Sequence, residues 1–137
     1  MSGDVAEGSL ISIRSDSDIV AARQAGRLLA SRIGFLGSDL TFIAAAISEV
    51  ARNIVEYARQ GEIEISFAQR GSATGILVVA RDRGPGIDDL QKAMQDGYST
   101  GSSLGMGLPG ARRLMDEFEI ASLPGQGTIV SMRKWRA

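Results

Sequence analysis

The chain lacks cysteine and histidine altogether, and only three of its 137 residues are proline. Without cysteine it forms no disulfide and offers no thiolate to a metal ion. Without histidine it has no Ser-His-Asp triad, no imidazole ligand for zinc and no histidine of its own to phosphorylate. These absences exclude several common kinds of metal site and nucleophilic catalysis.

Strong charge and long apolar runs are missing as well. The formal net charge is −1 and the pI is about 5.4, which excludes the basic footprint of a protein that binds nucleic acid or an anionic membrane. No apolar run approaches the roughly 20 residues of a membrane span, and residues 1–10 do not resemble a signal peptide. Hydrophobic residues make up 44% of the chain. We therefore expect one globular domain over residues 1–137, located in the cytoplasm.

Two amphipathic helices are predicted in the first half. The polar cluster Ser15-Asp16-Ser17-Asp18 is typical of a helix N-terminus, and Gly34 is typical of a helix end. Ser38 or Asp39 is predicted to cap the second helix, whose apolar residues recur at helical spacing as far as Ala58. A third helix is predicted to begin inside the glycine cluster at 105–110 and to carry its apolar stripe to residue 118.

Five strands are predicted between and after these helices. The strand at 9–14 is predicted to lie at a sheet edge, and the continuous apolar run at 76–80 predicts a central strand covered on both faces. Turn signals at 71–75 and 124–127 predict hairpins, so the expected fold is α/β (α+β): a two-layer sandwich with a mixed or antiparallel sheet and helices on one face. The other three strands are expected at 62–69, 118–123 and 128–135.

Glu49 and Asn53 are four residues apart on the predicted second helix, almost opposite its apolar stripe. The amide oxygen of asparagine is a hard ligand that suits Mg²⁺ beside phosphates and waters. A carboxylate one turn away can deprotonate an attacking hydroxyl. Taken alone, the pair is more typical of a solvated helix face.

Asp82 ends the predicted central strand and is followed by Gly84 and Gly86. A carboxylate in this position can accept a hydrogen bond from an exocyclic amine such as that of adenine, and the glycines permit a tight turn close to a ring. An ordinary strand-to-turn Asp-x-Gly has the same appearance.

The cluster Gly105-x-Gly107-x-x-Gly110 matches the dinucleotide-binding fingerprint in letters only, because the preceding residues are loop rather than strand. No P-loop and no protein-kinase signature set is present. Backbone N–H groups at the start of the following helix favour an anion, although a plain glycine-rich turn remains open. Residues 84–104, rich in turn formers, are predicted to be a flexible lid.

In this order the segments resemble the motifs of the GHKL ATPase and kinase superfamily. Residues 46–53 are similar to its N-box, and Asp82-x-Gly84-x-Gly86 is similar to its adenine-binding box. Gly105-x-Gly107-Leu108 resembles the phosphate-binding box behind the lid, and Gly125-x-Gly127-Thr128 resembles the last box. The resemblance implies the Bergerat ATP-binding fold, with ATP and Mg²⁺ as ligands.

The likeness is greatest to the small bacterial GHKL serine/threonine kinases that control sigma factors by partner switching, in particular the switch kinases of the stressosome. It rests on residues 18–24, 48–57, 96–100 and 107–118. It implies phosphorylation of a serine or threonine on a STAS-domain protein and, after release, activation of a PP2C-type phosphatase. An anti-sigma factor kinase that binds a sigma factor directly, and a nucleotide sensor without transfer activity, remain alternatives.

The resemblance also assigns roles to single residues. It implies that Asn53 binds Mg²⁺ and that Glu49 is the base toward the substrate hydroxyl. Arg112 or Arg113 could offset phosphate charge, but helix-surface arginines are more often solvated. The remaining nucleotide-binding positions implied are Asp82, Gly84 and Gly86 for adenine, Gly105 and Gly107 for phosphate, and Thr128 in support of the adenine end.

Overall fold

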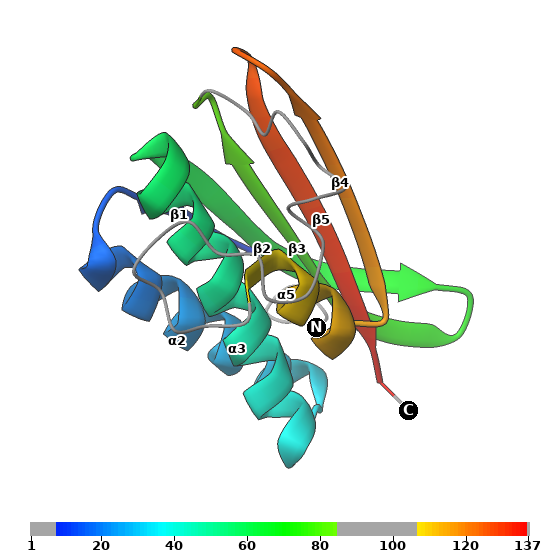
Figure 1. Cartoon of the computed structure of the whole chain (residues 1–137). Helices are drawn as coiled ribbons and strands as arrows, with labels where there is room; N and C mark the ends of the chain where they lie inside the picture. Colours follow the sequence, from blue (N-terminus) through cyan, green and yellow to red (C-terminus); the bar gives the residue numbers. More distant parts are fainter. Residues whose placement is uncertain (1–7, 85–106, 137) are drawn as a thin grey trace.

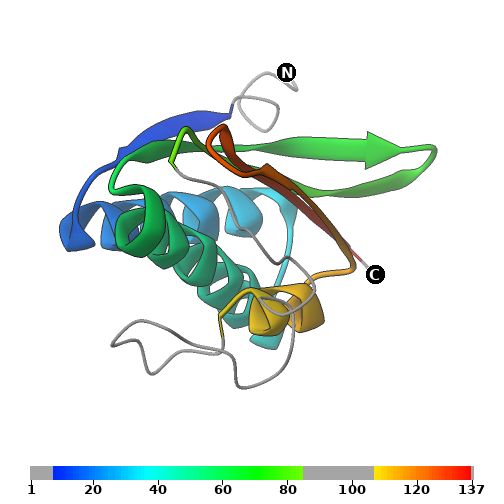
Figure 2. The ribbon, with the colours of Figure 1, turned by 45° about the horizontal axis from the view of Figure 1, so that its top comes forward.

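The computed structural model describes residues 8–84 and 107–136, which form a sheet layer and a helix layer (Figures 1 and 2). The sheet has five strands in the order β1-β2-β3-β5-β4, and every neighbouring pair is antiparallel. Its strands are β1 (Ser9–Ile13), β2 (Gly61–Arg70), β3 (Ala73–Asp82), β4 (Glu117–Leu123) and β5 (Gly127–Trp135). The helices are α2 (Asp16–Ile33), α3 (Ser38–Asn53), the π-helix η1 (Ile54–Ala58) and α5 (Gly107–Leu114). The predicted two-layer fold is confirmed, with the antiparallel form of the sheet.

The helix layer lies on one face of the sheet, as Figure 2 shows. Apolar residues at helical spacing on α2 and α3 and alternate residues of the strands meet in one core, which includes Ile19, Ile43, Ile47, Ile65 and Val78, all buried. Burial of this apolar surface is the main contribution to stability. No helix in the ranges 8–84 and 107–136 is long and apolar enough to cross a membrane.

The predicted ends of α2 are confirmed. Ser15 is its N-cap and forms a capping box with Asp18, whose carboxylate accepts a hydrogen bond from the Ser15 N–H. Gly34 adopts the left-handed conformation at the C-terminal end (φ 114°), and its N–H bonds to the carbonyl of Ala30. These local signals are strong because each satisfies backbone groups that the helix itself leaves unpaired.

Three predicted boundaries were wrong. The N-cap of α3 is Gly37, whose φ of 59° places it outside the helix, so neither Ser38 nor Asp39 caps it. The helix predicted to run to Ala58 is α-helical only to Asn53 and continues as the π-helix η1. The stripe predicted to extend α5 to residue 118 ends at Leu114, since Met115 lies between α5 and β4 and Phe118 belongs to β4.

The central strand was predicted to be covered on both faces, and this was also wrong. Burial alternates along β3, with Val78 and Ala80 buried under the helices and Leu77 and Val79 only half-buried on the other face. The predicted turn at 71–75 also shortens to two residues, because β3 already begins at Ala73. A continuous apolar run thus marks a central strand here, but not a third layer.

Candidate functional site

The Glu49 side chain lies where α3 meets α5. The Gly107 N–H at the first position of α5 donates to Glu49 Oε1 (3.1 Å), and Arg52 Nη1 lies 3.2 Å from Glu49 Oε2. The side chain of Glu49 is 11% exposed. The Glu49 side chain is therefore not part of a solvated helix face, because α5 covers this part of α3. The contact brings the predicted N-box together with the predicted phosphate loop.

Asn53 occupies the last position of α3, one turn after Glu49, and η1 begins with the next residue. Its side chain is half-buried, caps no helix and makes no hydrogen bond to another described residue. Single π-turns inside helices occur frequently at functional sites because they change the direction of the following side chains. The amide of Asn53 is thus available to a ligand.

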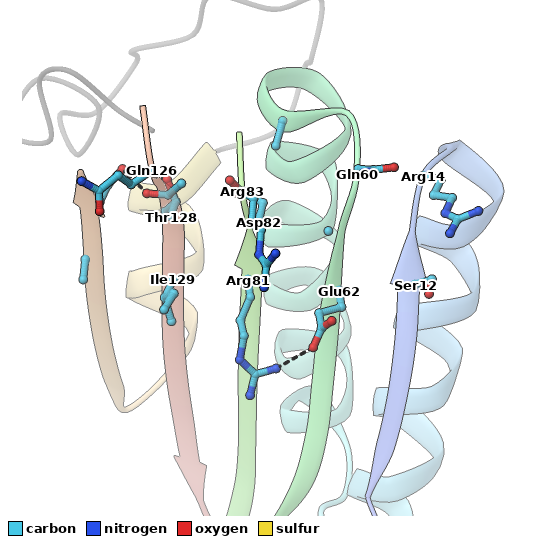
Figure 3. A pocket seen from close by; sticks show the side chains of 15 residues that line it. Ser12, Arg14, Gln60, Glu62, Arg81, Asp82, Arg83, Gln126, Thr128 and Ile129 are labelled. Atoms are coloured by element: carbon cyan, nitrogen blue, oxygen red, sulfur yellow. Dashed lines mark hydrogen bonds and ion pairs between the residues drawn. The ribbon is translucent and has the colours of Figure 1, made fainter. Parts of the chain in front are cut away.

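Asp82 and Thr128 are partners in the register between β3 and β5 and lie at the same end of the sheet (Figure 3). Asp82 Oδ1 accepts a hydrogen bond from the Gly84 N–H (2.9 Å). The Thr128 side chain is buried, and its Oγ1 is 2.8 Å from Ser122 Oγ on β4. The structure thus places two predicted nucleotide residues side by side and adds Ser122, which the sequence reasoning missed.

Gly84 and Ala58 connect this end of the sheet to η1. A Cβ atom on Gly84 would lie 2.5 Å from Ala58 Cβ and 2.7 Å from Ala58 Cα, so only glycine fits. The five residues of η1 therefore link Asn53 directly to the turn that holds Asp82. Of the other predicted glycines, Gly86 and Gly105 lie outside the described residues, as does the predicted lid apart from Gly84.

Gly127 requires the closest backbone approach at this end of the sheet. Its φ is 110°, and a Cβ atom there would lie 2.1 Å from the carbonyl oxygen of Asp82. Gly125 has a similar φ of 78°, but a Cβ atom there would meet nothing within 4 Å. A side chain at Gly125 would therefore cause backbone strain alone, whereas one at Gly127 would cause both backbone strain and a steric clash.

We expect Gly125→Ala to lower the free energy of unfolding by about 1 kcal/mol, the cost of a left-handed alanine. Gly127→Ala should lower it by about 1–3 kcal/mol more, because the methyl group also pushes β5 away from β3. Urea unfolding of both variants measures the difference. Equal losses would mean that β5 can move away from Asp82 without cost.

A cavity of about 750 Å³ opens at the same end of the sheet (Figure 3). Its lining includes Asp82, Gly127 and Thr128, but also Arg81 and Ile129, which point to the opposite face of the sheet because side chains alternate along a strand. Glu49, Asn53 and Gly107 do not line it. The cavity therefore crosses the end of the sheet, and Asp82 and Thr128 are the predicted nucleotide residues, among those that the structure describes, that line it.

The predicted site residues thus form two groups, Glu49 with Gly107 between α3 and α5, and Asp82 with Gly84 and Thr128 at the sheet end. Asn53 and η1 lie along the chain between them. Sequence reasoning missed Arg52, although it stands inside the predicted N-box. Arg112 is exposed and lies near the C-terminal end of α5, away from Gly107.

Similarity to known proteins identifies the family of this chain. Residues 14–134 match the family model of the histidine kinase-like ATPase domain. The chain is 48% identical over 127 residues to the serine/threonine-protein kinase RsbT of Bacillus subtilis, covering 93% of this chain and 96% of that protein. It is 34% identical over 101 residues to the anti-sigma F factor of Thermoanaerobacter sp. strain X514, covering 71% of each.

Solved structures agree at the level of the fold. The mycobacterial sensor histidine kinase MprB superimposes with a TM-score of 0.57 at 15% identity, over 94% of this chain and 97% of that one. The catalytic domain of the histidine kinase ThkA gives a TM-score of 0.52 at 14% identity, over 92% and 95%. The chain therefore belongs to the histidine kinase-like ATPase family, and within it to the serine/threonine protein kinases of the RsbT type.

Proposed function

We propose that this kinase acts in the cytoplasm, transfers the γ-phosphoryl group of ATP to a serine or threonine of a STAS-domain protein, and activates a PP2C-type phosphatase once its substrate releases it. The observation that carries the proposal is the hydrogen bond from the Gly107 N–H to Glu49, which joins the candidate base to the candidate phosphate loop. The 48% identity to RsbT supports the same interpretation.

In this proposal the adenine end of ATP is read at the end of the sheet. Asp82 has a second carboxylate oxygen beyond the one that accepts from Gly84, and this oxygen would accept from the exocyclic amine of adenine. Thr128, whose hydroxyl is hydrogen-bonded to Ser122, would line the adenine site next to Asp82. Buried donors and acceptors give specificity because a wrong base leaves them unpaired.

The residues at the end of α3 fit a magnesium ion held between protein and nucleotide. The Asn53 amide has no hydrogen bond to another described residue, and its oxygen is a hard ligand. Mg²⁺ characteristically takes one or two protein oxygens together with phosphate oxygens and waters, so one amide suits it. When bound, the ion would neutralise charge on the phosphates.

Transfer itself requires positioning and one proton acceptor. The substrate hydroxyl oxygen attacks the γ-phosphorus, the bond from this phosphorus to the bridging oxygen of ADP breaks, and the hydroxyl proton passes to Glu49. The Gly107 N–H at the start of α5 would bind a phosphate oxygen. The phosphate added to the partner brings roughly −1.5 to −2 charges to its surface and weakens its hold on the kinase.

The test is transfer of labelled phosphate from Mg·ATP to STAS-domain proteins of the same cell. We expect label on a serine or threonine of at least one of them, and stimulation of a PP2C-type phosphatase by the kinase alone. A chain that binds ATP but labels no STAS-domain protein would contradict the proposed substrate and favour a nucleotide-sensing module.

A second candidate is an anti-sigma factor kinase that holds a sigma factor directly. It is favoured by the 34% identity to an anti-sigma F factor over 71% of the chain. Purification from the native cell separates the two, since a sigma factor recovered in stoichiometric amount would support this second function and contradict the switch-kinase proposal.

A further inference from the structure

We propose that Arg52 binds the γ-phosphate of ATP, and that Glu49 occupies the place of this phosphate until the nucleotide arrives. The inference rests on the proposed function and adds to it a charged residue that binds substrate. It also assigns Glu49 a second role. Before ATP binds, its carboxylate positions the Arg52 guanidinium and the Gly107 N–H, and the γ-phosphate then replaces it as their partner.

Each oxygen of the Glu49 carboxylate contacts a different hydrogen-bond donor. Glu49 Oε1 accepts from the Gly107 N–H at 3.1 Å, and Glu49 Oε2 lies 3.2 Å from Arg52 Nη1. The two donors come from different elements, the N-terminal end of α5 and the last turn of α3. The guanidinium and the helix N-terminus therefore converge on one anion of the protein itself.

Both donors bind phosphate as readily as carboxylate. A guanidinium has N–H groups in a fork that fits either anion, and the first N–H groups of a helix carry a partial positive charge. Gly107 has a φ of 68°, a conformation that glycine adopts at no steric cost and that presents its N–H at the start of the helix. The carboxylate of Glu49 is therefore a smaller and less charged substitute for a phosphate.

Burial distinguishes this contact from an ordinary pair of charges on a helix surface. The Glu49 side chain is 11% exposed, whereas that of Arg52 is 32% exposed. Of the two charged groups, the Arg52 guanidinium is therefore the more accessible to an anion that enters from solvent. Arg112, by comparison, lies five residues after Gly107 on the eight-residue helix α5, away from its N-terminal end.

The consequence for the reaction is that ATP itself makes the base available. A γ-phosphate that takes the Gly107 N–H and the Arg52 guanidinium leaves Glu49 without its two partners, and the carboxylate can then accept the proton of the substrate hydroxyl. In the structure each oxygen of this carboxylate has one partner. Arg52 also offsets the negative charge of the transferring group.

The first test compares ATP with ADP, because ADP lacks the phosphate that Arg52 is proposed to bind. We expect Arg52→Gln to weaken ATP binding about tenfold or more, as for a lost charged hydrogen bond, while ADP binding changes less than about threefold. Arg52→Lys should recover part of the ATP affinity because it keeps the charge. Arg27→Gln, which removes an exposed arginine of α2, is the matched control and should change neither.

If Arg52→Gln lowers the affinities for ATP and ADP equally, or lowers neither, the inference is overturned. These measurements need no protein substrate. If wild-type chain binds ATP but labels no STAS-domain protein, the proposed function fails while the role of Arg52 is still decided.

The second test removes the charge of Glu49. Glu49→Gln should abolish transfer and yet tighten ATP binding several-fold, since the phosphate no longer competes with a carboxylate for Arg52 and Gly107. In the Arg52→Gln background, Glu49→Gln should raise the ATP affinity by a smaller factor, because the guanidinium for which phosphate and carboxylate compete is already absent. Weaker ATP binding by Glu49→Gln would contradict the proposal, since it would make Glu49 a support of the site rather than an occupant.

Discussion

Asn53→Ala is expected to lower phosphoryl transfer by at least about 10²-fold while leaving the protein folded. The amide of Asn53 makes no hydrogen bond to another described residue and caps neither α3 nor η1, so its removal breaks nothing in the described part of the fold. Alanine is also the better helix former, and the free energy of unfolding should stay equal or rise slightly. The loss of activity would thus come from the ligand and not from the scaffold.

Three measurements separate these effects: transfer of labelled phosphate, the Kd of ATP with and without Mg²⁺, and urea unfolding. We expect the variant to lose most of the gain in ATP affinity that Mg²⁺ gives to wild type. Gln24→Ala, which removes an exposed amide from α2, is the matched control and should behave as wild type. Retained activity and retained Mg²⁺ dependence in Asn53→Ala would exclude Asn53 as the metal ligand.

Much of the fold could be predicted because local signals and tertiary packing agree. The capping box of Ser15 and Asp18 and the left-handed Gly34 mark the two ends of α2, and the apolar residues at every second position from Ile63 to Phe67 mark β2. The misplaced boundaries lie where packing overrides a pattern. Phe118 continues the helical stripe of α5 in sequence, but in the structure it is paired with Met132 in the sheet.

The candidate site was predictable as a set of residues but not as an arrangement. Spacing alone puts Glu49 and Asn53 one turn apart, yet nothing in the sequence shows that α5 covers Glu49 or that Arg52 shares its carboxylate. Gly84 was expected to make room for a ring, whereas in the structure its missing side chain also makes room for Ala58. Contacts between elements distant in sequence decide these points.

Asp82→Asn tests the adenine end of the site without disturbing the turn around it. Asp82 Oδ1 accepts the Gly84 N–H, and an asparagine oxygen can accept the same hydrogen bond. The second oxygen, however, becomes an NH₂ group. It then presents a donor to the exocyclic amine of adenine, which is a donor itself, so the fold should persist while recognition is lost.

We expect ATP affinity to fall by about 10–100-fold, the equivalent of one hydrogen bond to a charged group at about 1.5–3 kcal/mol. The affinity for GTP should fall little or not at all, because guanine has a carbonyl oxygen at the corresponding position and the NH₂ group of asparagine can donate to it. Binding of both nucleotides to the variant, to wild type and to Gln24→Ala measures this difference. Equal losses of ATP and GTP would mean that the substitution has damaged the pocket as a whole, and no loss would remove Asp82 from the adenine site. A selective loss of ATP would establish that the carboxylate at the end of β3 reads the base, which steric fit alone does not explain.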